Sequence, residues 1–308
     1  MTRRTFLSFL LPILLLIPLG YLYLTYKVDS SFIVSQVRLP RFLLTLICGL
    51  VLGGVGSVYQ IMLNNPLAEP YILGVSSGAA LGGIVATILG FYLLIPLFSF
   101  GGALLIMMLV WYLAQTGGFF SGNKLLLSGI IVGMFCSSMI SLLMYLNQQE
   151  IGNIIGILMG NLGRIFNQQE WAIFKIIGVI IGLLMLYLYS LSDKLNILTS
   201  GDLVASSLGV DVKRLRLSVF IISSLLIGVT VAYAGIIGFV GLIVPHIVRM
   251  SIGNNQRQVF LLSALGGAIL LVLCDFLSMH LTVVEIPVGV ITSFIGSPFF
   301  IFYFTRRG

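Results

Sequence analysis

Charged side chains are scarce in this sequence: 8% of its 308 residues are Asp, Glu, Lys or Arg, whereas 59% are hydrophobic. An ordinary soluble domain carries about 25% charged residues, so a soluble chain of this size is excluded. The chain has only two histidines, and no Walker A glycine loop, Gly-x-Ser-x-Gly or His-Glu-x-x-His pattern occurs. The sequence therefore predicts neither an enzyme nor a chain that binds ATP through a Walker A loop.

The three cysteines, Cys48, Cys136 and Cys274, all fall in apolar runs. Their spacing fits neither a disulfide framework nor a zinc site, and small apolar side chains are the simpler interpretation. Ionisable residues are nearly absent from the interior of the apolar runs, and the one acidic residue there is Asp275. A transporter coupled to protons or sodium keeps such residues at mid-membrane. We therefore expect no metal or cofactor on this chain and an energy source in a partner.

Long apolar runs dominate the rest of the sequence. A bilayer core about 30 Å thick needs roughly 20 apolar residues per helix. Ten runs qualify, at 5–25, 41–61, 70–91, 94–114, 125–147, 171–191, 215–235, 239–251, 259–279 and 287–305. We expect an all-α integral membrane protein with one transmembrane domain over residues 1–308. The first run resembles a signal peptide, but no Ala-x-Ala-like site follows it, so we interpret it as a retained span.

Basic residues predict the orientation of these helices. With ten spans and the N-terminus inside, eleven of the 16 Lys and Arg residues are cytoplasmic. They are Arg3, Arg4, Lys124, Lys194, Lys213, Arg214, Arg216, Arg249, Arg257, Arg306 and Arg307. The positive-inside rule then places both termini in the cytoplasm. Spans two to five and seven to ten have similar lengths and opposite orientation, which is compatible with two inverted repeats.

Two basic residues oppose this rule. Arg38 and Arg41, in the segment Arg38-Leu-Pro-Arg41, precede the second span on its outer side. Their placement suggests an acidic partner at the outer face. Snorkelling toward lipid headgroups explains the same positions. Position alone favours neither interpretation.

A polar break, Asn64-Asn-Pro-Leu-Ala-Glu-Pro70, separates the second and third spans on the cytoplasmic side. Two prolines four residues apart cannot both lie inside one helix. One face of the preceding span carries small and polar residues: Thr45, Gly49, Gly53, Gly56, Gln60 and Asn64. Close helix packing explains the glycines, but Gln60 needs polar partners or water. We therefore expect this face to border an aqueous path near Gln60.

The longest polar cytoplasmic connection spans residues 192–214. Thr199, Ser200 or Asp202 can cap a short helix there, and Gly209 can end it. The apolar residues of that helix are Leu203, Val204, Leu208 and Val210. A short amphipathic helix outside the bilayer lies among lipid headgroups or binds a partner.

Glycines and one proline interrupt the apolar segment Gly235–Arg249, which predicts a broken and closely packed helix. His246 lies near its cytoplasmic end, and we interpret it as an interfacial hydrogen-bonding residue. His280 lies beside Met279 at the outer mouth. An exposed loop histidine is a simpler interpretation there than a contact to haem.

Six segments in order resemble the FecCD family of permeases, the membrane subunits of ATP-binding-cassette (ABC) importers for iron-siderophores, haem and vitamin B12. They are Arg38-Leu-Pro-Arg41; Gln60 with Asn65-Pro-Leu-Ala-Glu-Pro70; Leu73-Gly-Val-Ser-Ser-Gly-Ala79; Ala205 through Val210; Gly235 through Arg249; and Glu285-Ile-Pro-Val-Gly289 with Gly296-Ser-Pro-Phe299. The resemblance therefore extends over nearly the whole chain.

The resemblance implies a ten-helix subunit that dimerises around a central translocation path in the bacterial cytoplasmic membrane. A second permease subunit, identical or different, would complete the dimer. Two separate ATPase subunits would bind on the cytoplasmic side and use the ATP. An extracytoplasmic substrate-binding protein would dock on the outer side. Membrane lipid is the remaining expected partner, and nucleic acid is not one.

Roles also follow from the resemblance, residue by residue. Arg38 and Arg41 would pair with acidic residues of the binding protein. Family members often carry a third docking arginine where this chain has Met279, so docking would either rely more on those two or use a different geometry. The translocation path and its cytoplasmic gate would include Gln60, Asn64, Asn65, Leu67, Gly122 and Asn123. The coupling helix at about 202–210 would fit the ATPase through Asp202, Ala205, Ser206, Ser207, Leu208, Gly209 and Val210.

The resemblance thus implies an importer permease for a bulky metal chelate, either an iron-siderophore or haem. Corrinoid and oxyanion importers share the same sequence features and stay open as alternatives. A secondary transporter that works without an ATPase is a further alternative. An intramembrane enzyme is disfavoured, because the catalytic groups that it needs are missing.

Overall fold

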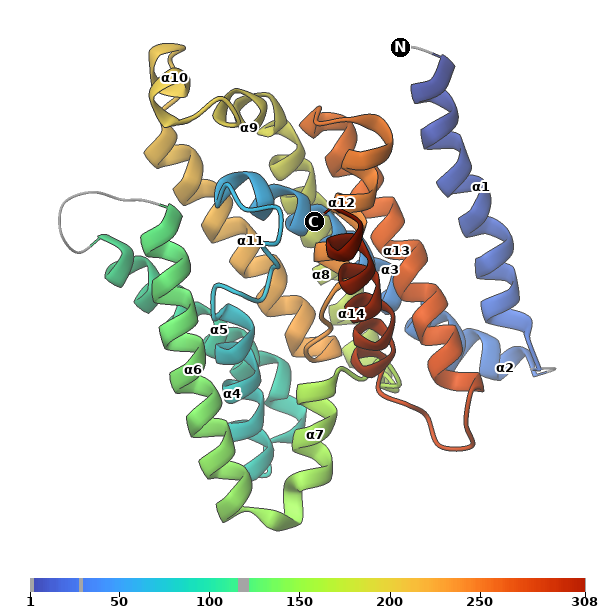
Figure 1. Cartoon of the computed structure of the whole chain (residues 1–308). Coiled ribbons are helices and arrows are strands. Elements are labelled where there is room, and N and C mark those ends of the chain that lie inside the picture. The colour runs from blue at the N-terminus through green and yellow to red at the C-terminus, as the bar shows by residue number, and fades with distance from the viewer. Residues whose placement is uncertain (1–2, 28–29, 116–121, 308) are drawn as a thin grey trace. The chain divides into compact units, whose positions relative to one another are not determined.

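The computed structural model describes residues 3–27, 30–115 and 122–307, and within these ranges the chain is helical with no strand (Figure 1). The helices are α1 (Arg3–Thr25), α2 (Ser31–Ile33), η1 (Val34–Arg38), α3 (Leu39–Met62), α4 (Val75–Ile88), η2 (Tyr92–Leu94), α5 (Ile95–Gln115), α6 (Gly122–Leu146), η3 (Gln148–Glu150), α7 (Ile151–Met159), α8 (Gln168–Ser190), α9 (Ser192–Leu198), α10 (Asp202–Ser207), α11 (Val212–Ala234), α12 (Val240–Ile252), α13 (Gln256–His280) and α14 (Val288–Arg307).

The predicted all-α membrane fold is confirmed. Among the described residues, six helices are long and apolar enough to cross a membrane, and shorter apolar helices accompany them at Leu14–Thr25, Val75–Ile88, Val240–Ile252 and Val288–Tyr303. Each coincides with one of the predicted spans. Apolar side chains also cover the exposed surface: on α8 only Phe174, Ile181 and Leu188 are buried, while Ile176, Val179 and Leu183 are exposed. Such a surface is suited to lipid.

The second span begins earlier than the sequence predicts. It runs from Ser31 to Met62, so Arg38 and Arg41 lie inside the helix and not before it. The stretch Val34–Arg38 is π-helical, and the backbone N–H of Leu39 donates to Val34 O. Pro40 has no N–H to donate, and the wider π-turn before it lets the helix continue through that position.

The chain packs as two compact units whose sequences interleave. One comprises Met1–Ser57, Leu162–Ser192 and Gly238–Gly308, and the other comprises Val58–Asn161 and Asp193–Ile237. We call them unit 1 and unit 2. The sequence predicts a single domain over residues 1–308, and this stays a prediction. Helix α3 begins in unit 1 and ends in unit 2.

Glycines of α3 bring backbones together inside unit 1. A Cβ atom on Gly53 would lie 1.9 Å from the carbonyl oxygen of Ser263 in α13, and one on Gly56 would lie 2.0 Å from Gly241 O in α12. Only a residue without a Cβ fits at such separations. The predicted face of small residues is therefore a helix-packing surface along its glycine-rich part.

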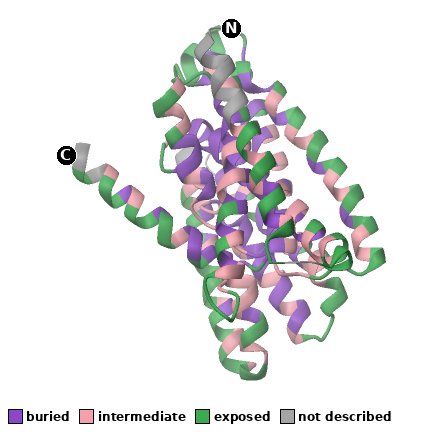
Figure 2. Ribbon diagram, turned by 90° about the vertical axis from the view of Figure 1, so that its right-hand side faces the viewer, coloured by how far each residue is buried: buried purple, intermediate pink, exposed green. Residues whose placement is uncertain are grey.

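Unit 2 is built from α4, α5, α6, α7 and α11. Helices α4, α5 and α6 run side by side (Figure 1). Ala80, Ile84, Ile140 and Ile154 form a buried apolar cluster where α4, α6 and α7 meet. Figure 2 shows buried residues gathered along the inner faces of the helices, whereas α14 of unit 1 is largely exposed over its second half.

The predicted break at Gly235 is present, because α11 ends at Ala234 and α12 begins at Val240. Open backbone in a membrane requires partners for its polar groups. They are supplied within unit 2: Ile236 N–H donates to Ile157 O at 3.0 Å, and Ile237 N–H donates to the Tyr71 hydroxyl at 3.1 Å. The break is thus ordered, and the backbone N–H groups of Ile236 and Ile237 both have hydrogen-bond partners.

Candidate functional site

The amphipathic helix of the longest polar connection is α10, which is shorter than predicted. It covers Asp202–Ser207 and not 202–210, because Gly209 takes the left-handed φ of 83° and ends it. None of the three predicted capping side chains caps it; Gly201 occupies the N-cap position without a side-chain hydrogen bond. Leu208, Gly209 and Val210 follow as the turn into α11.

Apolar side chains project from this element into solvent. Leu203 is 88% exposed and Leu208 is 64% exposed, whereas Ala205 is fully buried. Ser206 and Ser207 bond back to the chain, their hydroxyls donating to Asp202 O at 2.8 Å and Val204 O at 2.9 Å. The element therefore exposes two leucines while its Ala205 is buried.

An ion pair joins α10 to α11. The Arg216 guanidinium donates from Nη1 to Asp202 Oδ2 at 2.6 Å and from Nη2 to Asp202 Oδ1 at 2.9 Å. The Arg216 side chain is 8% exposed and that of Asp202 is 52% exposed. This is the bidentate geometry in which arginine binds carboxylates most strongly.

The polar break after α3 is ordered by Asn65. Its side-chain Oδ1 accepts from Leu67 N–H at 2.9 Å, and its carbonyl accepts from Ala68 N–H at 3.0 Å. Asn64 lies exposed in the left-handed region with φ 48°, and the Leu67 side chain is 38% exposed. The two prolines do end the helix, and the non-helical stretch extends to Gly74, where φ is 74°.

The other three predicted path residues are Gln60, Gly122 and Asn123. Gln60 is 5% exposed, so within this chain it is buried and not on an open surface. The aqueous path predicted beside it stays a prediction. Gly122 and Asn123 begin α6, and their side chains lie outside the described residues.

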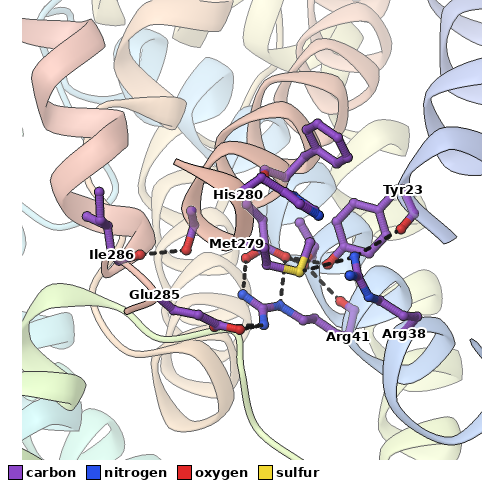
Figure 3. A network of polar contacts seen from close by, with 11 residues as sticks. Tyr23, Arg38, Arg41, Met279, His280, Glu285 and Ile286 are labelled. Carbon is purple, nitrogen blue, oxygen red and sulfur yellow. Dashed lines mark hydrogen bonds and ion pairs between the residues drawn. The ribbon is translucent and has the colours of Figure 1, made fainter. Parts of the chain in front are cut away.

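Arg41 lies at the centre of a polar network within unit 1 (Figure 3). Its Nη2 donates to Asp275 Oδ1 at 2.8 Å, and its Nη1 donates to Glu285 Oε2, also at 2.8 Å. Asp275 is fully buried and also accepts from the Tyr23 and Thr45 hydroxyls. The network ties α1, α3 and α13 together, so Arg41 is engaged inside its own chain and is not a free docking residue.

Arg38 lies beside this network. Its Nη1 donates to Tyr23 O at 3.2 Å and to Met279 Sδ at 3.5 Å. Met279 thus contacts Arg38, whereas many relatives are expected to place an arginine there. His280 hydrogen-bonds Phe276 O through Nδ1 at 2.8 Å and packs edge-on against Tyr26. Among the described residues, no group of three or more His, Cys, Asp or Glu could hold a metal ion.

The sequence interpretation missed the Arg41–Asp275 and Asp202–Arg216 ion pairs. A signal for the first was present, since a lone aspartate in an apolar run needs a cation and Arg41 lies at a matching depth in another span. Arg216 gave a weaker signal, because a basic residue near the predicted cytoplasmic end of a helix also fits the positive-inside rule.

Comparison with known proteins identifies the family. A model of the FecCD transport family matches residues 10–306, which is nearly the whole chain. The chain belongs to the FecCD transport family. The chain is 37% identical over 289 residues to the hemin transport system permease protein HmuU of Yersinia pestis, covering 88% of this chain and 83% of that protein. It is 36% identical over 274 residues to the vitamin B12 import system permease protein BtuC of Salmonella typhi, covering 87% and 82%.

Two solved structures are similar to this chain in fold. An ABC transporter described as of metal-chelate type, in an inward-facing conformation, superposes with a TM-score of 0.86 at 32% identity, covering 94% of this chain and 96% of that one. The PsaBC complex of Streptococcus pneumoniae superposes with a TM-score of 0.60 at 20% identity and shares the fold. This FecCD protein is therefore an ABC importer permease, a membrane transport subunit.

Proposed function

We propose that this FecCD permease imports a bulky metal chelate, an iron-siderophore or haem, into the cytoplasm. The observation that carries the proposal is its end-to-end similarity to a hemin permease and to a metal-chelate transporter. A corrinoid is the second candidate, supported by 36% identity to a vitamin B12 permease. The chain itself would bind no cofactor, and ATP would be used by a partner.

The proposal includes three kinds of protein partner. A second permease subunit would complete a translocation path, and two ATPase subunits would bind through α10. The exposed Leu203 and Leu208 support this role, since apolar side chains projecting from a polar connection favour a protein partner. An extracytoplasmic binding protein would dock on the opposite side. In this arrangement both termini lie in the cytoplasm.

The gate and docking residues belong to the same proposal. Asn65 and Leu67, with Asn64, would form the cytoplasmic gate, and Gln60, Gly122 and Asn123 would lie along the path. For docking, Arg38 is the stronger candidate, because the carboxylates of Asp275 and Glu285 already occupy the Arg41 guanidinium. Arg41 would take part only if a partner carboxylate replaced that of Glu285.

Reconstitution tests this function. The permease, its ATPase and its binding protein would be placed in liposomes and offered hemin, a ferric siderophore and cyanocobalamin in separate assays. We expect uptake of one iron chelate that requires ATP and stops with ADP. Uptake of cyanocobalamin alone would favour the second candidate. Equal uptake driven by an ion gradient without ATP would overturn the importer proposal, as would failure of the ATPase to co-purify.

A further inference from the structure

We propose that Asp202 and Arg216 form a positioning clamp that makes α10 move together with α11, so that movement of the ATPase reaches the membrane-spanning part of unit 2. The inference rests on the proposed function, in which α10 is the ATPase-binding element. It assigns a role in energy coupling to two residues that need not touch substrate or nucleotide.

The clamp spans a turn of the chain that contains a glycine with positive φ. Helix α10 has six residues, and glycines with positive φ flank it: Gly201 at 101° and Gly209 at 83°. A single helical turn between two such positions holds its direction poorly by itself. The Asp202–Arg216 pair connects the first residue of α10 to the second turn of α11, and so bypasses the Gly209 turn.

Burial makes the pair persistent. The Arg216 side chain is 8% exposed, and its Nε is buried with no hydrogen-bond partner. The Asp202 carboxylate is therefore the group that balances this guanidinium. Releasing it would leave a buried cation uncompensated, which is far less favourable than separating a surface ion pair. We infer that the pair stays closed while α10 moves.

A nearby ion pair, Asp211–Arg214, is exposed to solvent on both sides, unlike the Asp202–Arg216 pair. Arg214 Nε lies 3.0 Å from Asp211 Oδ2, but the two side chains are 87% and 53% exposed. Both residues belong to the beginning of α11, and their pair bridges no turn between two helices. A solvent-exposed pair of this kind contributes little. Its presence in the same region provides a matched control.

Arg216, at one end of the clamp, belongs to a helix that packs against two others in unit 2. Helix α11 packs against α5 and α4 within unit 2. The loop that contains Asn65 and Leu67 belongs to the same unit. A displacement delivered at Arg216 is thus passed into the compact unit that carries the proposed gate.

The test compares variants of the full reconstituted complex by the number of substrate molecules imported per ATP hydrolysed. The probe is whichever of hemin, ferric siderophore and cyanocobalamin the wild-type complex imports. The variants are Asp202→Asn, Asp202→Glu and Asp202→Asn/Arg216→Met, with Arg214→Gln as the control. The double variant removes both charges, which is often neutral for folding, so it should assemble even where Asp202→Asn alone misfolds.

We expect import per ATP hydrolysed, counted only over complexes that contain the ATPase, to fall about fivefold in the double variant, which is the low end of typical coupling between sites. Asp202→Glu keeps a carboxylate and should recover most of the coupling, and Arg214→Gln should match the wild type. A merely structural role predicts that import and hydrolysis fall in proportion to the assembled complex. That result, or an unchanged ratio in the double variant, overturns the clamp. A wild-type complex that imports nothing with ATP contradicts the proposed function instead.

Discussion

The guanidinium of Arg41 and the carboxylate of Asp275 face each other between α3 and α13, with Nη2 and Oδ1 2.8 Å apart and both side chains buried. A charge in an apolar protein interior is tolerated only with a partner of opposite sign. The pair therefore explains how an aspartate can occupy the last turns of an otherwise apolar helix.

Asp275→Asn should destabilise the protein by about 3–5 kcal/mol, the usual cost of breaking a buried ion pair by removing one partner. Thermal unfolding of the purified protein in detergent measures it. Glu285→Gln is the matched control, because Glu285 binds the same guanidinium but its side chain is 52% exposed. The control should cost less than about 1 kcal/mol. Equal losses in the two variants would contradict the structural role of Asp275.

Glu285→Gln has a second expected effect, on docking. The Glu285 carboxylate occupies Arg41 Nη1, where an acidic residue of the binding protein would otherwise bind. Removing its charge should tighten binding of that protein by about tenfold, equivalent to about 1.4 kcal/mol for a charge-assisted hydrogen bond. Surface plasmon resonance at low salt measures the affinity. An unchanged or weaker affinity would mean that Arg41 serves the internal network alone.

Arg38→Glu tests the residue that remains available for docking. Arg38 hydrogen-bonds to the Tyr23 carbonyl and to Met279 Sδ, and among the described residues its guanidinium forms no ion pair. Reversal should weaken binding-protein docking by about tenfold at low salt and less at high salt, where charges are screened. If the affinity stays the same at low ionic strength, snorkelling toward lipid is the better interpretation of Arg38.

The sequence predicted the helices well because membrane helices depend on one strong signal, the length of apolar runs. It also located the break at Asn64–Pro70, because two prolines four residues apart cannot both lie inside one helix. It could not show that Arg41 is satisfied within its own chain. Arg41 and Asp275 lie at similar depths in their spans, but their contact also depends on the rotation of α3 and α13, which the apolar runs do not reveal. The start of the second span was wrong because a π-turn before Pro40 has no clear sequence pattern.

The glycines of α3 offer a sharper test of packing. Gly53→Ala would place a Cβ 1.9 Å from Ser263 O, and backbone cannot yield as a side chain does. We expect a loss of about 1–3 kcal/mol or more, typical of overpacking. Gly182→Ala in α8 is the control, because nothing lies within 4 Å of its Cβ. Alanine there should be neutral or stabilising by about 1 kcal/mol. Similar unfolding temperatures for the two variants would argue against close contact of α3 and α13.

Asn65 and Leu67 give the last prediction, which concerns the gate. The Asn65 side chain holds the Leu67 backbone through a 2.9 Å hydrogen bond, so it shapes the loop, whereas the Leu67 side chain supplies the bulk. Asn65→Ala should loosen the loop and Leu67→Ala should open it, and both should raise leak of a fluorescent dye from liposomes in the absence of ATP. Asn65→Asp keeps the accepting oxygen and should preserve the turn. We expect the two alanine variants to differ in stability, because only Asn65→Ala removes a hydrogen bond. Its loss should lower the free energy of unfolding by about 1 kcal/mol. If neither alanine variant leaks more than the wild type, the loop does not close the path.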